Sequence, residues 1–205
     1  MTKREKEIID KFYKETGCEL SAKYGKFYYN GNLDLVGNKI ISQLPDELTV
    51  NGFLDLSDSS VIELPNNLIV NGFLSLCRTY VTKLPENLTV YGDLFLTNTL
   101  ITELPNNLIV NGSLCLNYSN ITKLPDKLTI GRSIHLEHTD INSLPENLTV
   151  FGDLGLTYSA IKELPENLTV GGYLNISNTD ITKLPDNLVV ISVHITQLYP
   201  SYLIT

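Results

Sequence analysis

The sequence contains little cysteine, an excess of acidic over basic side chains, and no long apolar run. Its three cysteines, Cys18, Cys77 and Cys115, are odd in number and lack the spacing of metal ligands, which fits a reducing, cytoplasmic setting. The 15 basic residues face 23 acidic ones, and a net charge of -8 argues against direct binding to nucleic acid. No apolar stretch approaches the roughly 20 residues of a membrane span, and the start of the chain, charged from Lys3 onward, does not look like a secretory signal.

The residue groups that carry out catalysis are also missing. The chain has no glycine loop that would cradle a phosphate, no metal-binding pair of carboxylates, and no nucleophile with a plausible base. Cys115, His135 and His138 could approach one another in a repeating fold, but a zinc site would need a further ligand or water and converging geometry. The sequence therefore predicts a protein that is not an enzyme and that uses no metal or cofactor.

What the sequence does have is a repeat with a period of 20 residues. Eight of its nine prolines follow a leucine. The Leu-Pro pairs begin at residues 44, 64, 84, 104, 124, 144, 164 and 184. A fixed period of about 20 residues is typical of a solenoid, in which each coil stacks on the one before it. We therefore expect a β-rich solenoid of about eight coils.

Within each coil, apolar residues alternate on both sides of a glycine. In the third full repeat they are Leu88, Val90, Leu94 and Leu96, with Gly92 between them. A period of two predicts β-strand, here two short strands bent at the glycine. Gly131-Arg132 breaks the glycine column and predicts a local shift of that bend.

The pattern L-x-L-x-x-N-x-I followed by L-P, seen first at residues 33–45, resembles the leucine-rich repeat in its short bacterial form. The resemblance covers roughly residues 27–190, and similar LP..LTV.G.L.L..T repeats occur in short bacterial and phage proteins. It implies one strand in each coil, a superhelix, and recognition of proteins through the strand face. This chain departs from the family pattern in its second strand signal, LTV-x-G, so strong curvature is not expected.

Most coils also replace the family's asparagine with a hydroxyl residue. A buried turn leaves backbone N–H and C=O groups that need partners, and a hydroxyl can both donate and accept. We therefore expect this column to be buried and structural. Its members are Ser59, Thr79, Thr99, Ser119, Thr139, Ser159 and Thr179.

The two ends of the chain differ from the repeats. Residues 2–17 predict a helix with an N-terminal capping box (Thr2, Glu5), a stripe of apolar side chains (Ile8, Ile9, Phe12, Tyr13) and a closing glycine. Such a helix would cap the open end of the stack, and docking of a partner is the alternative. We divide the chain into a cap at 1–23, a solenoid at 24–190 and a C-terminal segment at 191–205.

At the C-terminus the alternation slips by one residue. Val189, Ile191, Val193 and Ile195 alternate where the earlier register would place Ser192, His194 and Thr196 inward. A one-residue slip exchanges the two faces of a strand. Residues 191–205 are therefore expected either to bulge and fold back as a cap or to form an apolar edge for a homodimer.

Two outward columns have the character of a scaffold. The residue before each Leu-Pro pair alternates in sign, as in Glu63, Lys83 and Glu103, which avoids a ladder of like charges. The residues after the proline form an acidic edge with a ladder of asparagines beside it, and we assign both to turn chemistry and solubility.

The outward positions of the second strand, in contrast, are not repeated. Aromatic side chains and an arginine on an exposed sheet are typical of binding hot spots. For Phe53 and Phe73, covering the N-terminal end of the stack is an alternative. The candidate partner-binding residues are Phe53, Phe73, Arg78, Phe95, Tyr118, His135, His138, Tyr158 and Tyr173.

These observations favour an interaction module that binds a partner protein through its strand face, as an effector, adaptor or inhibitor of bacterial or phage origin. One alternative is an acidic mimic of nucleic acid that blocks a nuclease, for which the acidic edge would be the contact. The other is a structural repeat that assembles with itself.

Overall fold

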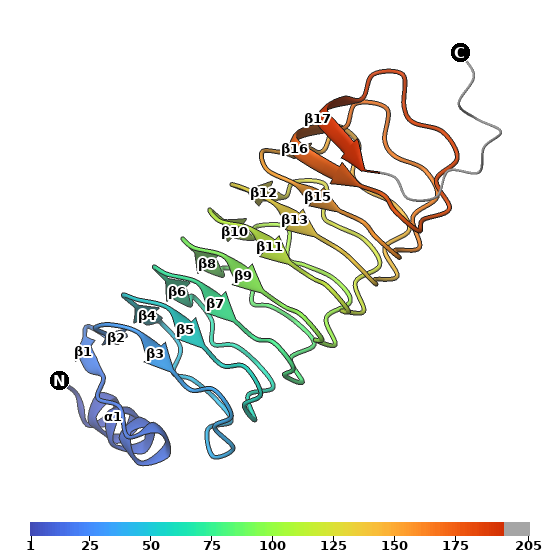
Figure 1. The fold of residues 1–205 in the computed structure, drawn as a ribbon. Helices are drawn as coiled ribbons and strands as arrows, with labels where there is room; N and C mark the ends of the chain where they lie inside the picture. The colour runs from blue at the N-terminus through green and yellow to red at the C-terminus, as the bar shows by residue number, and fades with distance from the viewer. Residues whose placement is uncertain (195–205) are drawn as a thin grey trace.

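The computed structural model describes residues 1–194 and shows a β-solenoid of about eight coils with one helix at its N-terminal end. Figure 1 shows the coils stacked side by side in an elongated, nearly straight body, with the helix lying across one end. Each complete coil contributes two short strands, which form two sheets joined at the bend between the strands. The predicted fold class is confirmed.

The seven-stranded sheet begins with an antiparallel hairpin and continues with parallel strands. It consists of β1 (Ser21–Lys23), β2 (Lys26–Tyr29), β4 (Leu48–Val50), β6 (Ile69–Val70), β8 (Thr89–Val90), β10 (Ile109–Val110) and β12 (Thr129–Ile130).

The ten-stranded sheet is parallel, and β16 spans the bend so that it pairs with strands of both halves of the preceding coil. It consists of β3 (Leu33–Asp34), β5 (Leu54–Asp55), β7 (Leu74–Ser75), β9 (Leu94–Phe95), β11 (Leu114–Cys115), β13 (Ile134–His135), β14 (Thr149–Val150), β15 (Leu154–Gly155), β16 (Thr169–Asn175) and β17 (Val189–His194).

The register between coils places equivalent residues next to each other. Leu54 pairs with Leu74, Leu74 with Leu94, and Leu94 with Leu114. All four side chains are fully buried. Because a single coil buries its apolar side chains only between its neighbours, the stack, rather than the coil, is the stable unit.

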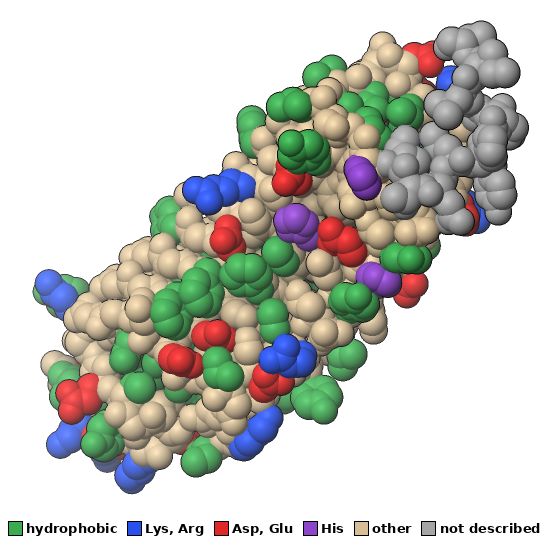
Figure 2. Space-filling view, in the orientation of Figure 1, with side chains coloured by type: hydrophobic (Ala, Val, Ile, Leu, Met, Phe, Trp, Pro, Cys, Tyr) green, Lys and Arg blue, Asp and Glu red, His purple; other side chains and the backbone are tan. Residues whose placement is uncertain are grey.

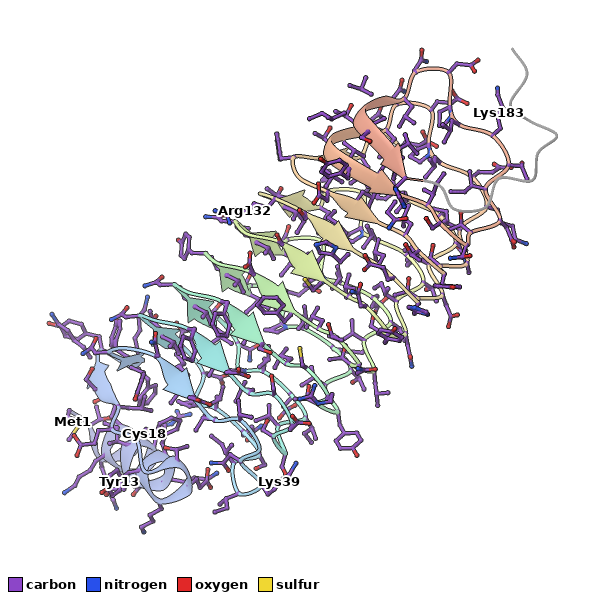
Figure 3. All side chains as sticks on the ribbon, in the orientation of Figure 1. Met1, Tyr13, Cys18, Lys39, Arg132 and Lys183 are labelled. Carbon is purple, nitrogen blue, oxygen red and sulfur yellow. The ribbon has the colours of Figure 1, made fainter. Side chains whose placement is uncertain are left out.

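The glycine column lies where two coils come closest at the bend. A Cβ atom on Gly112 would stand 2.6 Å from the carbonyl carbon of Gly92, nearer than real Cβ atoms come to backbone. At the next coil Arg132 takes the glycine position, yet its N–H still donates to the Gly112 carbonyl at 3.1 Å. The close approach moves to Gly131, whose Cβ would meet the Asn111 carbonyl. The bend itself stays at residues 131–132, as in the other coils, so the predicted shift of the bend is wrong. Figure 3 shows Arg132 projecting away from the stack.

The hydroxyl column is buried, as predicted, except at Thr179, which is half-buried. Its bonds stay within one coil, because each hydroxyl that donates does so to the carbonyl three residues earlier. Those bonds are Thr79 to Leu76, Thr99 to Leu96, Ser119 to Leu116, Thr139 to Leu136 and Thr179 to Ile176, at 2.6–2.7 Å. The hydroxyl thus satisfies an inward carbonyl at the turn.

The N-terminal cap is helix α1 (Lys3–Thr16). Thr2 and Glu5 form the predicted capping box, and Gly17 ends the helix in a left-handed conformation with φ of 73°. Phe12 is buried against the core, whereas Tyr13, which we predicted to share that stripe, is 52 % exposed. The Glu5 carboxylate also accepts from the Gly25 N–H at 2.8 Å, which ties the helix to the β1–β2 hairpin.

At the C-terminal end the slip of one residue is absorbed by a bulge in β16 rather than by an exchange of faces. Val170 pairs with Val190 and Leu174 with Val193, with the extra residue between Val170 and Tyr173. A bulge accommodates one additional residue on one strand and restores the pattern beyond it.

The predicted alternation of Val189, Ile191 and Val193 on one face is therefore wrong. Val189 and Ile191 point outward, 60 and 77 % exposed, while Val193 turns inward and packs on the core. The choice between a folded-back cap and a dimer edge depends largely on residues 195–205, which lie outside the described residues. Within residues 1–194, no helix is long and apolar enough to cross a membrane.

Candidate functional site

The strand face is the outward surface of the ten-stranded sheet along β3, β5, β7, β9, β11, β13, β15 and the second half of β16. In each coil it extends from the residue before the strand to the turn residues that follow it. Figure 2 shows this surface, with a row of hydrophobic side chains in its N-terminal half, histidine side chains farther along the stack, and acidic side chains beside both. All nine predicted partner-binding residues lie on it. Their placement in the structure shows which of them form contiguous groups.

Three phenylalanines form the first group. Phe53 and Phe73 stack with ring centroids 4.5 Å apart and planes within 8°, and Phe95 meets Phe73 edge-on at 5.9 Å. All three are half-buried, and the group spans three successive coils rather than covering the N-terminal end, which α1 closes. Helix α1 lies across the N-terminal end of the stack, and the phenylalanines lie on the outward side of the coils that follow it. Together these rings offer a partner a rigid apolar surface.

A second group runs along the edge of the strand face. Tyr118 and His138 stack at 4.4 Å, and His138 and Tyr158 at 4.7 Å. The two tyrosines remain 53 and 55 % exposed. Three stacked rings held in one column form an ordered, exposed aromatic ladder.

The aromatic ladder occupies backbone positions that do not favour such residues. Each coil places one residue after the strand in the left-handed region. These residues are Asp58, Arg78, Asn98, Tyr118, His138, Tyr158 and Asn178, with φ of 56–58°. Asparagine, aspartate and histidine are enriched in this conformation, whereas other side chains lose roughly 1–2 kcal/mol. Arginine and tyrosine at three of the seven positions point to a requirement other than folding.

Arg78 is held by an ion pair across two coils. Its Nε donates to Asp58 Oδ1 at 2.8 Å and its Nη2 to Asp58 Oδ2 at 2.5 Å. The hydrogen bonds from Arg78 hold the pKa of Asp58 below its ordinary value, and Asp58 in turn raises the pKa of Arg78. Because both groups are exposed, the pair fixes the orientation of the guanidinium more than it stabilises the fold.

His135 and Glu137 lie near the centre of the strand face. His135 Nδ1 is 3.5 Å from Glu137 Oε1, and this hydrogen bond raises the pKa of His135. Burial pushes the pKa of Glu137 up, but the bonds from His135 and from the backbone outweigh burial and leave it lowered. The Glu137 side chain folds over Gly155 of the next coil, where a Cβ would collide with it.

Cys115 lies beside His135 but is chemically quiet. Burial, followed by the nearby carboxylates of Asp93 and Glu137, raises the pKa of Cys115 to about 11, so the thiol stays protonated at neutral pH. Within residues 1–194 no three histidine, cysteine or acidic side chains are placed to hold a metal ion.

Tyr173 stands apart from the other predicted residues. It is 62 % exposed on β16, and its amide donates to Asp153 Oδ1 at 2.8 Å. Sequence reasoning missed Asp58, Glu137 and Asp153, since nothing in a column of outward residues shows which side chain reaches the next coil. The signal available was their charge on an otherwise neutral strand position.

Comparisons with protein-family models, with curated proteins and with solved structures found no match.

Proposed function

We propose that this chain is a non-enzymatic interaction module that binds a partner protein through the strand face. The observation that carries the proposal is the aromatic ladder of Tyr118, His138 and Tyr158, in which both tyrosines have backbone conformations that cost stability. Bulky side chains held there at a cost to folding are accounted for by a role in recognition.

The phenylalanine cluster supports the same role. Phe53, Phe73 and Phe95 are outward-facing rings on a sheet whose core is already filled by leucine. Half-buried aromatic side chains that lose little conformational freedom on binding are the side chains that dominate protein interfaces. The two aromatic groups together extend over coils from β5 to β15, enough length for a protein surface.

We also propose that the coils are of the leucine-rich-repeat type. The support is the buried L-x-L pattern on the ten-stranded sheet, followed by a polar residue that satisfies an inward carbonyl. The second sheet, in place of helices, agrees with the nearly straight stack in Figure 1.

The mimic of nucleic acid is the weaker candidate. It needs a continuous negative ridge, and the Leu-Pro edge does not offer one, because Lys83 and Lys123 line the same groove as Glu86, Glu103 and Asp126. The carboxylates of this edge would attract a basic nuclease groove, but the lysines between them would repel it.

The test is capture of a partner by the immobilised chain from a lysate of cells that carry the gene, with identification by mass spectrometry. Substituting alanine for Phe73, Phe95 and Tyr118 should abolish capture and leave the melting temperature within a few degrees of the wild type. Alanine at Tyr80, Tyr91 and Phe151 removes three rings that lie off the strand face, and this matched control should still capture the partner. Capture by the first variant would reject the strand face.

A further inference from the structure

The charges of the coils are sorted between faces. Between residues 33 and 178 the basic side chains are Lys39, Arg78, Lys83, Lys123, Lys127, Arg132 and Lys162. Arg78 belongs to the strand face, where Asp58 neutralises it. The Lys39 ammonium reaches the same turn and donates to the Asp58 carbonyl, so both cations are bound there. The strand face also carries Asp34, Asp55, Asp93, Glu137 and Asp153. A surface with several carboxylates and no free lysine complements a cationic partner.

Folding does not explain why these side chains are charged. Asp93 Oδ1 accepts from the Ser113 N–H at 2.7 Å, and Asp153 Oδ1 accepts from the Tyr173 N–H at 2.8 Å. In the same column Ser133 accepts the equivalent bond from the Asp153 N–H at 2.9 Å with a neutral hydroxyl.

Asn32 does the same with an amide oxygen, which accepts from the Phe53 N–H at 3.2 Å. Neutral side chains therefore fill the structural role, and the negative charge is additional. Each aspartate uses one oxygen for the backbone, which fixes the carboxylate and leaves the second oxygen without a partner among the described residues.

The third outward position adds polar side chains to this surface. Glu137 Oε2, Thr157 Oγ1 and Ser177 Oγ lie in successive coils, and each is buried with no hydrogen-bond partner in the described chain. Ser177 is 4 % exposed. Buried polar atoms normally have partners. Ser159 Oγ, which lies inward in the hydroxyl column, is unpaired as well, so the missing partners are not confined to the strand face.

Resting on the function proposed above, we propose that the partner presents a lysine- and arginine-rich segment, whose cationic groups lie against Asp93, Glu137 and Asp153 while its apolar groups pack on the phenylalanine cluster. Asp93 and Glu137 belong to coils two apart, which sets their backbones about 10 Å from each other along the stack. Basic side chains spaced along one segment of protein can reach both.

The test is selection from a phage-displayed library of random twelve-residue peptides against the full chain. The affinities of selected peptides are then measured by fluorescence anisotropy. Peptides that lose binding to the Phe73→Ala, Phe95→Ala, Tyr118→Ala variant should be enriched in lysine and arginine.

The charge is removed by Asp93→Asn, Glu137→Gln and Asp153→Asn. Each substitution keeps the shape of the side chain and an oxygen that can accept from a backbone N–H. This variant should bind the selected peptides about tenfold or more less tightly than the wild type does. The matched control, Glu86→Gln, Glu146→Gln and Glu166→Gln, changes net charge by the same amount on the Leu-Pro edge and should weaken them by less than about threefold.

The outcomes separate the two proposals. The cationic partner is rejected if the peptides that need the aromatic groups are neutral or acidic. It is also rejected if both charge variants lose the same affinity for them. In either case the proposal that the strand face binds a partner still stands. Failure to select any peptide that depends on the aromatic side chains overturns both.

Discussion

The two sheets share one interior but differ in what they show to solvent. Inward, both present the same fully buried leucine and valine columns, such as Val90 and Leu94. Outward, the seven-stranded sheet repeats β-branched residues, with Thr89, Ile109 and Thr129 in one column. These are the residues that a sheet surface favours. The strand face of the other sheet abandons them for aspartate, serine, phenylalanine and histidine, so demands other than strand formation decide its composition.

The largest effect is expected where the hydroxyl column is broken. Thr99→Val keeps the volume but removes the bond to the Leu96 carbonyl, leaving a buried acceptor unpaired, and should lower the free energy of unfolding by about 1–3 kcal/mol. Thr89→Val, on the outside of the seven-stranded sheet, is the control and should change it by less than about 0.5 kcal/mol. Urea denaturation measures both, and equal losses would contradict the assignment of inside and outside.

An intermediate effect is expected at the left-handed position of the strand face. Asn98→Ala should lower the free energy of unfolding by about 1 kcal/mol, because alanine adopts φ of 56° less readily than asparagine does. Asn98→Gly should change it much less, since glycine adopts this conformation without a steric cost. If alanine were as stable as asparagine here, the aromatic ladder would carry no cost and the main support for its binding role would disappear.

The smallest effect concerns His135. Its pKa is raised in the folded chain by Glu137, so the resulting stability is fully present below the pKa of the unfolded chain and is lost as pH rises through the folded value. Because the imidazole is one-third exposed, the change should stay below about 1 kcal/mol. NMR titration should show that the pKa of His135 is lower in Glu137→Gln than in the wild type. An unchanged pKa would mean that Glu137 does not raise the pKa of His135.

Much of the fold could be predicted because the repeat expresses it eight times. The helix, the bend and the buried hydroxyls each follow from local patterns of residues in the sequence. The capping box, for example, follows from the spacing of Thr2 and Glu5. The last coil could not be predicted, since whether a slip exchanges faces or is absorbed by a bulge depends on β16, not on the slipped segment.

The candidate site was predicted by position but not by arrangement. Alternation identifies Phe73 as outward, and the position just past the strand identifies Tyr118 and His138. It does not show that Tyr118 and His138 sit at left-handed turns and stack, or that Glu137 reaches across to Gly155. Such contacts depend on side-chain length and on the next coil, which a column of letters does not contain.

The stacking distance of the coils has a consequence for any chain laid along them. Columns of the strand face advance by about 4.8 Å per coil, whereas same-side residues of an extended peptide advance by about 6.7 Å and the turns of a helix by about 5.4 Å. Neither the peptide repeat nor the helical pitch equals the spacing of the coils. A ligand that runs the length of the stack is therefore displaced by a different amount at each coil. If all coils had identical strand faces, such a ligand could not make the same contact with each coil. Because each coil carries a different outward side chain, the ligand has one preferred alignment along the stack.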